Sequence, residues 1–270
     1  MKRMILLFGC SLSLLVSSGM AVFNPGITEA AGEVNLYSYR QPFLIKPILN
    51  KFTQNTGIKV NIMFAKKGIL EKIKATPGAA DAVLTSDIGS LNDLTEAGVL
   101  QPVKSKSLKQ NIPAAYRHPD GYWFGLTMRA RVLFVSKDRI EPGQVTSYED
   151  LTKPELRGRI CVRSGKHTYN ISLFASIITH KGEAFTRKWL KGLQANLARK
   201  PSGNDRAQAK AIYTGQCDIG IANTYYMGKM QTNKKKAAQK KWAASIRIVF
   251  PNQNDRGTHV NVSGGAITKG

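Results

Sequence analysis

The sequence predicts an α/β fold in which strands and helices alternate along the chain. Residues 32–65 have the pattern of a strand, a helix and a second strand, and residues 147–182 and 204–230 each combine helices with a strand. Alternation of this kind places helices on both faces of the sheets. With 270 residues and 42% hydrophobic content, the chain can form one large domain or two lobes with sizeable cores.

The first strand-helix-strand unit has clear limits. Residues 32–40 alternate in hydrophobicity and predict a short strand, residues 41–57 predict a helix that ends at Gly57, and residues 58–65 predict the next strand. A helix, a strand with a loop, and a short helix closed by glycine are then expected at residues 67–78, 79–87 and 89–98.

A long apolar strand is predicted at residues 122–138, long enough to pass from one lobe into another. It contains Arg129 and Arg131, which are two positions apart and therefore face the same side. A buried arginine there demands an anion, either a carboxylate in an interlobe ion pair or a bound oxyanion. The planar guanidinium suits a bidentate oxyanion such as carbonate or phosphate.

The second half of the chain places tyrosines where two strands end. Residues 159–163 and 217–223 predict strands, each followed by a helix. Tyr169 follows the first, and Tyr225 and Tyr226 follow the second. Ligands of open α/β sheets bind outside the carboxyl ends of the strands, so these positions are candidate binding residues.

Phenols at such an edge suit a hard, highly charged cation. A tyrosine hydroxyl has a pKa of about 10 and stays neutral at neutral pH, but a bound cation stabilises the phenolate. Phenolate oxygen suits a hard metal as thiolate suits a soft one, and three phenolates offset a trivalent charge. Packing at the edge of a core is the alternative role of a tyrosine pair.

Other metal and catalytic patterns are weak. Outside the first thirty residues the only cysteines, Cys161 and Cys217, lack a C-x-x-C pattern, and whether they pair is left open. The four histidines show no close metal spacing: His118, His167, His180 and His259. No G-x-S-x-G, P-loop or G-x-G-x-x-G motif occurs.

The first thirty residues predict a secretory signal peptide. Lys2 and Arg3 precede an apolar run at residues 5–16, and Thr28-Glu29-Ala30 resembles a cleavage site. The apolar run is too short for a comfortable membrane span, which needs roughly 20 residues. We therefore expect an exported protein, with a retained N-terminal anchor as the alternative.

The chain is strongly basic, with a formal net charge of +23. Such a charge favours capture of anionic partners, whether a small ligand, a membrane surface or nucleic acid. An exported protein rarely meets nucleic acid, so we expect no nucleic-acid partner. The lysine run at residues 233–242 has no interleaved stacking aromatics and fits a solvated helix face.

Five separated blocks, in one order, resemble the bacterial periplasmic ferric-ion-binding proteins. They are "VNLYSYRQPFLIKPIL", "WFGLTMRARVLFVSKD", "RGRICVRSGKHTYNISLFAS", "ANLARKPSGNDRAQAKAI" and "NTYYMGKM". That family supplies the substrate-binding components of iron(III) ABC importers. The resemblance runs from about residue 33 to the last residue and implies a two-lobed, type II periplasmic-binding-protein fold similar to a transferrin lobe.

The resemblance also implies a ligand set. Tyr169, Tyr225 and Tyr226 match the iron-ligating tyrosines of the family, and Arg129 or Arg131 falls in the block that holds the accompanying anion. The metal expected is Fe(III), with a synergistic anion such as carbonate (bicarbonate) or citrate.

One departure from the family concerns the N-terminal block. Some branches read Y-S-S-R-H-Y there and use the histidine and the last tyrosine as ligands, whereas residues 37–42 read Y-S-Y-R-Q-P. This suggests the branch in which oxygens of an exogenous anion complete the coordination. Arg40 and Gln41 are then expected near the anion rather than on the metal.

The lobes are expected at residues 31–128, with residues 249–270 returning to the first lobe, and at residues 129–248. Strand crossings near residues 126–132 and 247–253 would form the hinge. Family members usually continue into a further helical segment that packs on the first lobe, whereas this sequence stops at Gly270. We expect that C-terminal segment to be missing and apolar surface to be exposed.

The predicted function is binding of Fe(III) in the periplasm for delivery to an ABC-type iron permease in the inner membrane. The protein is expected to be a monomer and not an enzyme. Three alternatives stay open: a binder of another anionic or small organic solute, a secreted hydrolase using residues 164–169, and a polyanion-binding surface protein. The sequence leaves open which anion binds and whether ferrous iron also binds.

Overall fold

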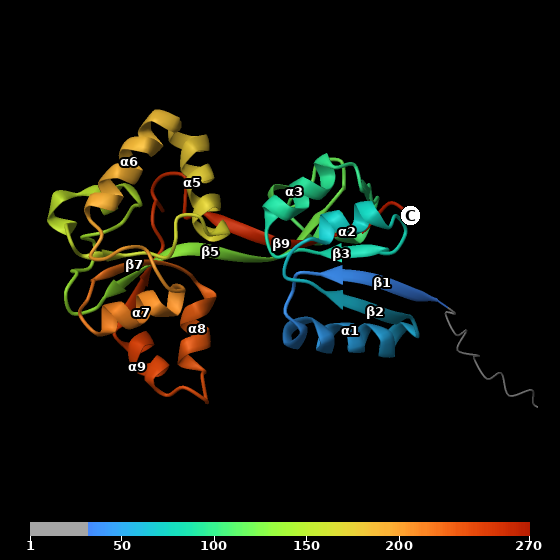
Figure 1. The fold of residues 1–270 in the computed structure, drawn as a ribbon, viewed down its shortest axis with the longest axis horizontal. Helices are drawn as coiled ribbons and strands as arrows, with labels where there is room; N and C mark the ends of the chain where they lie inside the picture. The colour runs from blue at the N-terminus through green and yellow to red at the C-terminus, as the bar shows by residue number, and fades with distance from the viewer. Residues whose placement is uncertain (1–31) are drawn as a thin grey trace, which may run out of the picture.

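The computed structural model describes residues 32–270, so the predicted signal peptide lies outside the described residues. These residues form two α/β lobes joined by two long strands, β5 (Phe124–Ser136) and β9 (Val260–Thr268), as Figure 1 shows. In residues 32–270 no helix has the length and apolar character that a membrane crossing requires. The predicted two-lobed α/β fold is confirmed.

The first lobe is built on the predicted strand-helix-strand unit. β1 (Glu33–Ser38) and β2 (Lys59–Phe64) are parallel neighbours, with α1 (Pro42–Thr56) connecting them. β3 (Ala82–Leu84) lies parallel on the other side of β1 and pairs in turn with β9, which runs antiparallel to it. β4 (Leu100–Gln101) also pairs with β9.

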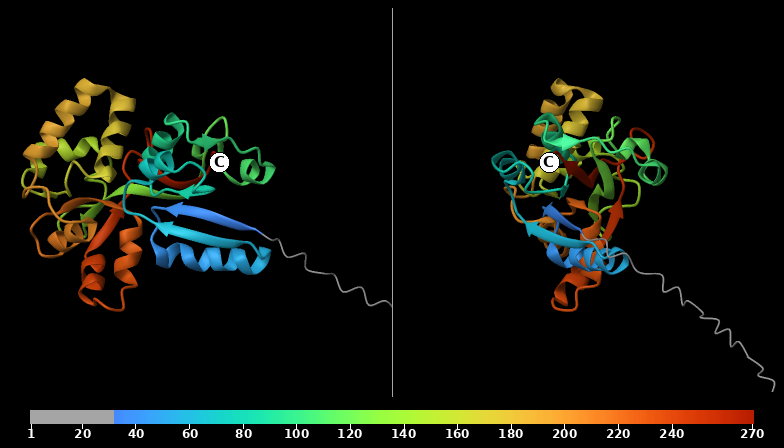
Figure 2. Two further views of the ribbon diagram at one scale, coloured as in Figure 1. Left: turned by 45° about the vertical axis from the view of Figure 1, so that its right-hand side comes forward. Right: turned by 90° about the vertical axis from the view of Figure 1, so that its right-hand side faces the viewer.

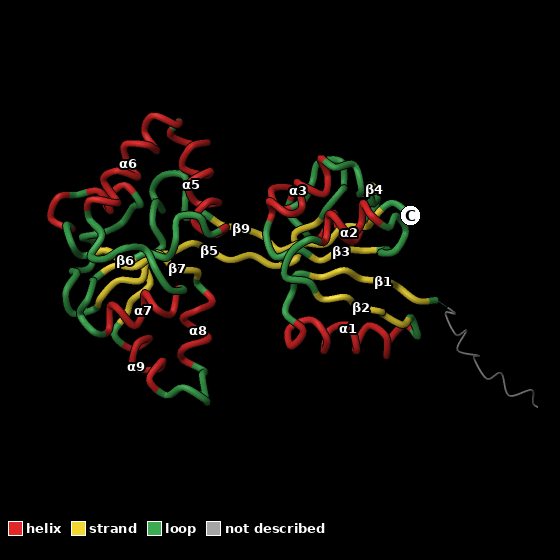
Figure 3. Tube along the Cα trace, viewed as in Figure 1, coloured by secondary structure: helices red, strands yellow, loops and turns green. Residues whose placement is uncertain are grey.

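Helices lie on both faces of this first sheet. α1 lies on one face, and α2 (Ile69–Ala75) and α3 (Ile88–Glu96) lie on the other (Figure 3). A short helix, α4 (Lys106–Asn111), follows β4. α1 has no buried residue, and Phe43 and Ile48 are 63% and 64% exposed. The first lobe therefore presents apolar side chains on the outside of α1.

The second lobe has its own sheet. β6 (Ile160–Cys161) and β7 (Ile219–Asn223) are parallel, and β7 and β8 (Ile246–Val249) pair antiparallel with the second half of β5. One face carries α5 (Thr168–Lys181) and α6 (Glu183–Ala195), and the other carries α7 (Asp205–Tyr213), α8 (Tyr225–Gln231) and α9 (Ala238–Ala244). Figure 2 shows the same division in turned views.

Alternation along β5 explains why the second half of this strand reads as a continuous apolar run. Leu133 and Val135 belong to the core under α5 and α6, whereas Val132 and Phe134 belong to the core under α7 and α9. All four side chains are 0% exposed. Successive strand residues point to opposite faces, so a sheet that is covered on both sides needs apolar residues at every position.

The segment at residues 147–157 differs from the prediction. A helix was expected there, and the structure has two 3₁₀ turns instead, Glu149–Thr152 and Pro154–Leu156. Pro154 has no backbone N–H to donate and disfavours helical geometry in the residue before it, so an α-helix cannot continue through this segment.

The crossing between the lobes also differs from the prediction in one detail. The return crossing was expected at residues 247–253, but β8 still pairs with β5 inside the second lobe, and β9 is the strand that returns. The β5–β9 register shifts between Gly125 and Thr127. At Gly264, opposite Gly125, an added Cβ would lie 2.4 Å from the Phe124 carbonyl oxygen, so this close approach requires glycine.

A disulfide joins Cys161 in β6 to Cys217, which lies just before β7. The pairing that the sequence left open is therefore present. Both residues are buried between the parallel strands and α7, so the bond fastens neighbouring parts of the second sheet.

Candidate metal centre

Two strand ends place the candidate tyrosines. β6 and β7 are parallel neighbours, with Ile160 opposite Ile219. Their carboxyl ends consequently meet at one edge of the sheet. Tyr169 is the second residue of α5 and Tyr225 is the first residue of α8, so the two helix starts that follow these strands bring them together.

The phenol side chains form one cluster. The hydroxyl oxygens of Tyr169 and Tyr225 lie 3.1 Å apart, within hydrogen-bond distance. The rings of Tyr225 and Tyr226 pack with their centroids 4.5 Å apart and an interplanar angle of 33°. The Asn223 side-chain amide lies 3.4 Å from the Tyr225 hydroxyl and donates to it. The structure thus brings together residues that are 56 positions apart in the sequence.

Burial governs the protonation of these phenols. It raises the pKa of Tyr225 well above its ordinary value, and the hydrogen bond with Tyr169 raises it further. Burial likewise raises the pKa of Tyr226. Without a bound cation both hydroxyls are therefore protonated at neutral pH, so a ligand that needs phenolates must displace their protons.

Each of the three rings has a cationic side chain close to it. The Cζ atom of Arg163 lies 4.9 Å from the Tyr169 ring centroid, Lys229 Nζ lies 4.9 Å from that of Tyr225, and Arg206 Cζ lies 5.6 Å from that of Tyr226. Burial, with Arg206 and Arg40 adding, lowers the pKa of Lys229. This positive surrounding favours negative charge on the phenol oxygens.

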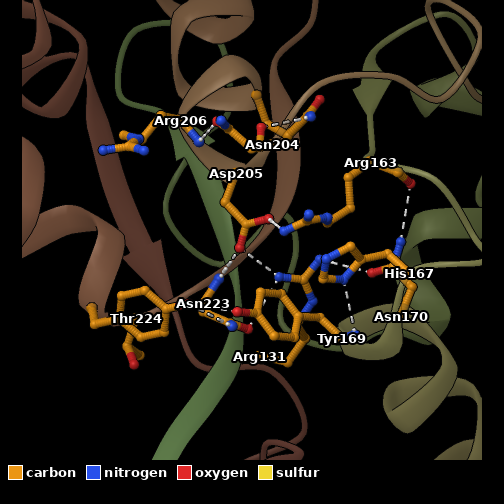
Figure 4. Close-up of polar contacts among 12 residues, drawn as sticks. Arg131, Arg163, His167, Tyr169, Asn170, Asn204, Asp205, Arg206, Asn223 and Thr224 are labelled. Atoms are coloured by element: carbon orange, nitrogen blue, oxygen red, sulfur yellow. Dashed lines mark hydrogen bonds and ion pairs between the residues drawn. The ribbon is translucent and has the colours of Figure 1, made fainter. Parts of the chain in front are cut away.

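Arg131 points into the second lobe and is almost fully buried, with a side-chain exposure of 3%. Its Nη1 donates to Asp205 Oδ2 at 2.7 Å and to Asn223 Oδ1 at 3.1 Å, and its Nη2 donates to Asn170 Oδ1 at 2.7 Å (Figure 4). A carboxylate of the same lobe therefore pairs with this arginine, and the interlobe ion pair considered from the sequence is not the one formed.

Arg129 and Arg40 converge on a single hydroxyl. Ser263 Oγ accepts from Arg40 Nη1 at 2.8 Å and from Arg129 Nη1 at 3.3 Å. Arg129 Nη2 is buried and has no hydrogen-bond partner among the described residues. Burial lowers the pKa of Arg129. Two guanidinium groups therefore meet at one serine, and within residues 32–270 Arg129 Nη2 is a donor without a partner. Such a pair of guanidinium groups suits an oxyanion.

Gln41 lies beside Arg40 at the start of α1. It is the N-cap residue of this helix, its side chain makes no capping hydrogen bond, and it is exposed. The side-chain amide is therefore free to turn toward a ligand, in contrast to the engaged donors of Arg131.

A narrow cavity lies between the arginines and Tyr169, close to the crossing strands. It is lined by Arg129, Arg131, Tyr169, Asn223, His259 and Asn261. His259 Nε2 lies 2.9 Å from Ser172 Oγ. Burial, with Arg131 and Arg129 adding, lowers the pKa of His259 to about 4, so the imidazole is neutral at neutral pH.

The donor chemistry of the region points to oxygen ligands. Across residues 32–270, no three or more His, Cys, Asp or Glu side chains gather where they could hold a metal ion. The phenols at the strand ends are oxygen donors, and oxygen donors suit hard cations.

The loop considered as a hydrolase site has no nucleophile-base contact. Ser164 Oγ accepts from the backbone N–H of Lys166, and His167 Nδ1 accepts from the backbone N–H of Tyr169. Both side chains thus serve the turn that starts α5.

Several residues of the region were not singled out from the sequence. Asp205 is the first residue of α7, and Ser263 belongs to a strand without a recognisable motif. The signal that could have found the amides is position, because Asn170 follows Tyr169 and Asn223 ends the strand before Tyr225. The polar residues around the tyrosines and the arginine pair are: Arg163, Asn170, Asp205, Asn223, Lys229 and Ser263.

Comparison with known proteins places this arrangement in a family. The family described as bacterial extracellular solute-binding proteins matches residues 79–269. The iron uptake protein A1 of Synechocystis sp. is 43% identical over 262 residues, covering 95% of this chain and 72% of that protein.

Two solved structures show the same fold. The ferric iron-binding protein A of Mannheimia haemolytica, in an open conformation, has a TM-score of 0.81 and 50% identity over 88% of this chain and 75% of that one. A Trichodesmium protein in complex with iron and citrate has a TM-score of 0.83 and 42% identity over 88% of this chain and 76% of that one. The chain belongs to the bacterial extracellular solute-binding proteins, a family of binding proteins and not of enzymes, in the branch that contains the periplasmic ferric-ion-binding proteins.

Proposed function

We propose that this protein binds Fe(III) in the periplasm through the phenolates of Tyr169, Tyr225 and Tyr226, together with an exogenous anion. The observation that carries the proposal is the 3.1 Å approach of the Tyr169 and Tyr225 hydroxyls at the shared edge of β6 and β7. A trivalent ion at that edge replaces the phenol protons and is balanced by three phenolate charges.

We assign the anion to Arg40 and Arg129, the arginine pair that donates to Ser263. Arg129 comes from β5 and Arg40 follows β1, so an oxyanion between them and the metal would contact both the crossing strand and the first lobe. Gln41 is the next residue after Arg40, and Arg131 lines the same cavity as Arg129. Carbonate and citrate both have the required oxygens, and the Trichodesmium relative was solved with iron and citrate.

Delivery follows from the family and from the two-lobed shape. The two lobes move about β5 and β9, so that closure shields the loaded metal and favours one conformation of the pair. The predicted signal peptide sends the protein to the periplasm, where it presents the metal to an ABC-type permease.

Titration of the purified mature protein with ferric nitrilotriacetate tests the proposal. Phenolate-to-iron charge transfer should produce a visible absorbance band that saturates near one metal per chain. Tyr213→Phe, which changes an exposed tyrosine at the end of α7, is the matched control and should leave the band intact. A colourless protein that takes no iron from the chelate would overturn the assignment.

A second candidate rests on the same arginine pair. Two guanidinium groups at Ser263 could hold a phosphate or a carboxylate solute without metal. Phosphate and citrate binding measured by calorimetry, with and without iron, separates the two functions. Tight anion binding that does not change with iron would favour this second candidate.

A further inference from the structure

A buried charge cluster lies directly behind the candidate tyrosines. Asp205 is 0% exposed, and its two carboxylate oxygens accept from Arg131 Nη1 at 2.7 Å and from Arg163 Nη1 at 2.9 Å (Figure 4). We refer to Arg131, Asp205 and Arg163 as the arginine-aspartate cluster. It brings two cations and one anion into the interior of the second lobe.

Arg131 joins the two segments that carry the tyrosines. Its guanidinium donates to Asn170, the neighbour of Tyr169 in α5, and to Asn223, the last residue of β7 before the turn into α8. Asp205 accepts from the backbone N–H of Asn223 at 2.8 Å, which fixes the same strand end. One planar side chain therefore links the two segments, which also meet at the Tyr169 and Tyr225 hydroxyls.

Arg163 completes the cluster and lies next to Tyr169. Its Cζ lies 4.9 Å from the Tyr169 ring centroid, and its backbone carbonyl accepts from the Asn170 side chain at 3.0 Å. Arg163 therefore contacts the Tyr169 ring through its guanidinium and the start of α5 through its backbone carbonyl.

Stability alone does not account for the cluster. Moving charges into the interior carries a desolvation cost, and replacing buried ion pairs by apolar residues is often neutral or stabilising. The cluster keeps three ions buried next to the two segments that carry the tyrosines. This placement points to a role in fixing the positions of the tyrosines.

We propose that Arg131, Asp205 and Arg163 are positioning residues that hold Tyr169 and Tyr225 in their metal-binding arrangement before the metal arrives. This inference rests on the proposed function. It follows that the second lobe presents these two tyrosines already arranged for the metal.

Arg131→Lys tests the role of geometry against that of charge. Lysine keeps the positive charge, but a single ammonium cannot reproduce the fork that reaches Asp205, Asn223 and Asn170 together. We expect the dissociation constant for iron to rise about 10- to 100-fold, the usual effect of losing a partner that orients a ligand, and the charge-transfer band to shift in wavelength.

Arg139→Lys is the matched control. Arg139 pairs with Asp218 in the same lobe, at the opposite end of the β5–β7 strand pair from Arg131. The same substitution there should alter thermal stability at most, with iron affinity and band position unchanged. A shift of the band in Arg131→Lys and Arg139→Lys alike would show that the loss of any arginine-carboxylate pair in this lobe has this effect, and would overturn the positioning role.

Arg163→Met provides a second variant in case Arg131→Lys fails to fold. It leaves the Arg131–Asp205 pair intact and electrically balanced, so the melting temperature should be kept or raised. Weaker iron binding and a shifted band are still expected, because Tyr169 loses the guanidinium behind its ring.

Three outcomes separate this inference from the proposed function. Absence of the band in the unchanged protein refutes iron binding itself. A normal band in the unchanged protein, together with wild-type affinity and wavelength in folded Arg131→Lys or Arg163→Met, refutes only the positioning role. A shifted band in both variants and not in Arg139→Lys supports it.

Discussion

At the residue scale, the adjacent tyrosines at the start of α8 differ in their neighbours. Tyr225 shares a hydrogen bond with Tyr169, whereas Tyr226 stacks on Tyr225 and faces Arg206. Under the proposed function, the doublet would give two oxygens from the start of α8, and Tyr169 would give the third from the start of α5.

Removal of these hydroxyls should abolish tight iron binding. For Tyr169→Phe, Tyr225→Phe and Tyr226→Phe we expect dissociation constants at least about 100-fold higher, since losing a ligand exceeds the 10- to 100-fold effect of its supporting partners. Competition with nitrilotriacetate measures the change, with Tyr213→Phe as the unaffected control. If Tyr226→Phe binds iron normally, the third oxygen must come from another group.

Iron binding should weaken as the pH falls. Burial raises the pKa of Tyr225 and Tyr226, so these phenols are protonated in the free protein and release protons when metal binds. Affinity therefore increases with pH and is lost on acidification, because protons compete with the metal for the same oxygens. Iron release followed by absorbance between pH 8 and pH 4 should show this slope (on the order of one proton per phenol). Affinity that does not depend on pH would contradict phenolate ligation.

The sequence predicted the three tyrosines but could not assign the arginines. Arg129 and Arg131 share a strand face, yet β5 changes partner between them: Arg129 pairs with Asn261 in the first sheet, and Arg131 pairs with Asn223 in the second. The hydrophobic pattern carries no signal for that change. Resemblance and periodicity therefore left both arginines as anion candidates, whereas three-dimensional neighbours distinguish them.

At the element scale, the disulfide should supply a large part of the stability of the second lobe. Cys161 and Cys217 are 56 positions apart, and closing a loop of that size in the unfolded chain is worth about 4 kcal/mol by the chain-entropy relation. The double variant Cys161→Ala, Cys217→Ala should lose about 2–5 kcal/mol in unfolding free energy, measured with urea. Two free thiols in the unfolded, unreduced mature protein would show instead that the bond does not form.

His259, the residue just before β9, should make the free protein acid-sensitive. Burial and the nearby Arg131 and Arg129 lower its pKa to about 4, below the unfolded value of about 6.5. Because the pKa is lower in the folded protein, the contribution of neutral His259 to the unfolding free energy is present above pH 6.5. This contribution of roughly 3 kcal/mol is lost as the pH falls toward 4. Urea unfolding of iron-free protein at several pH values measures this loss.

His259→Gln is the comparison for that measurement. Glutamine has no titrating group, so the unfolding free energy of the unchanged protein should fall by roughly 3 kcal/mol more than that of the variant as the pH falls from 7 to 4. A constant difference across this range would mean that His259 does not titrate in the folded protein as its burial requires.

Elements with strong periodicity were predictable from the sequence, and short ones were not. The β1–α1–β2 unit and the α7–β7–α8 order were correctly expected, because each has a clear pattern and a glycine or polar boundary. The two 3₁₀ turns at 149–156 and the return through β9 depend on Pro154 and on pairing with a distant strand. The local sequence pattern contains little information on which distant strand an element pairs with.

At the scale of the whole molecule, the net charge of +23 should accelerate capture of anionic iron chelates. The exposed lysines of α9 and the cations beside the tyrosines lie in the same lobe. We expect the association rate with ferric citrate to fall at least about 10-fold between 10 and 200 mM salt, because screening shortens the reach of the field. Stopped-flow absorbance measures the rate, and a rate that is independent of salt would exclude electrostatic steering.

Loading with iron should also make the molecule more compact. The lobes are connected by β5 and β9, and ligands proposed on both sides of the cleft would draw them together. Small-angle scattering of iron-free and iron-loaded protein should show a smaller radius of gyration on loading. An unchanged radius with a full charge-transfer band would mean that the metal binds to the second lobe without closure.

The path of β9 has a consequence for the order of events during synthesis. All elements of the second lobe lie between the two passes through the crossing, so this lobe has its strands as soon as β8 has emerged. In the first lobe, β3 finds its outer partner only when Leu84 meets Gly265. Until then β3 exposes an unpaired edge, which is a template for aggregation. A chain that lacks β9 should therefore need a chaperone for its N-terminal third, even though all strands of the second sheet are present.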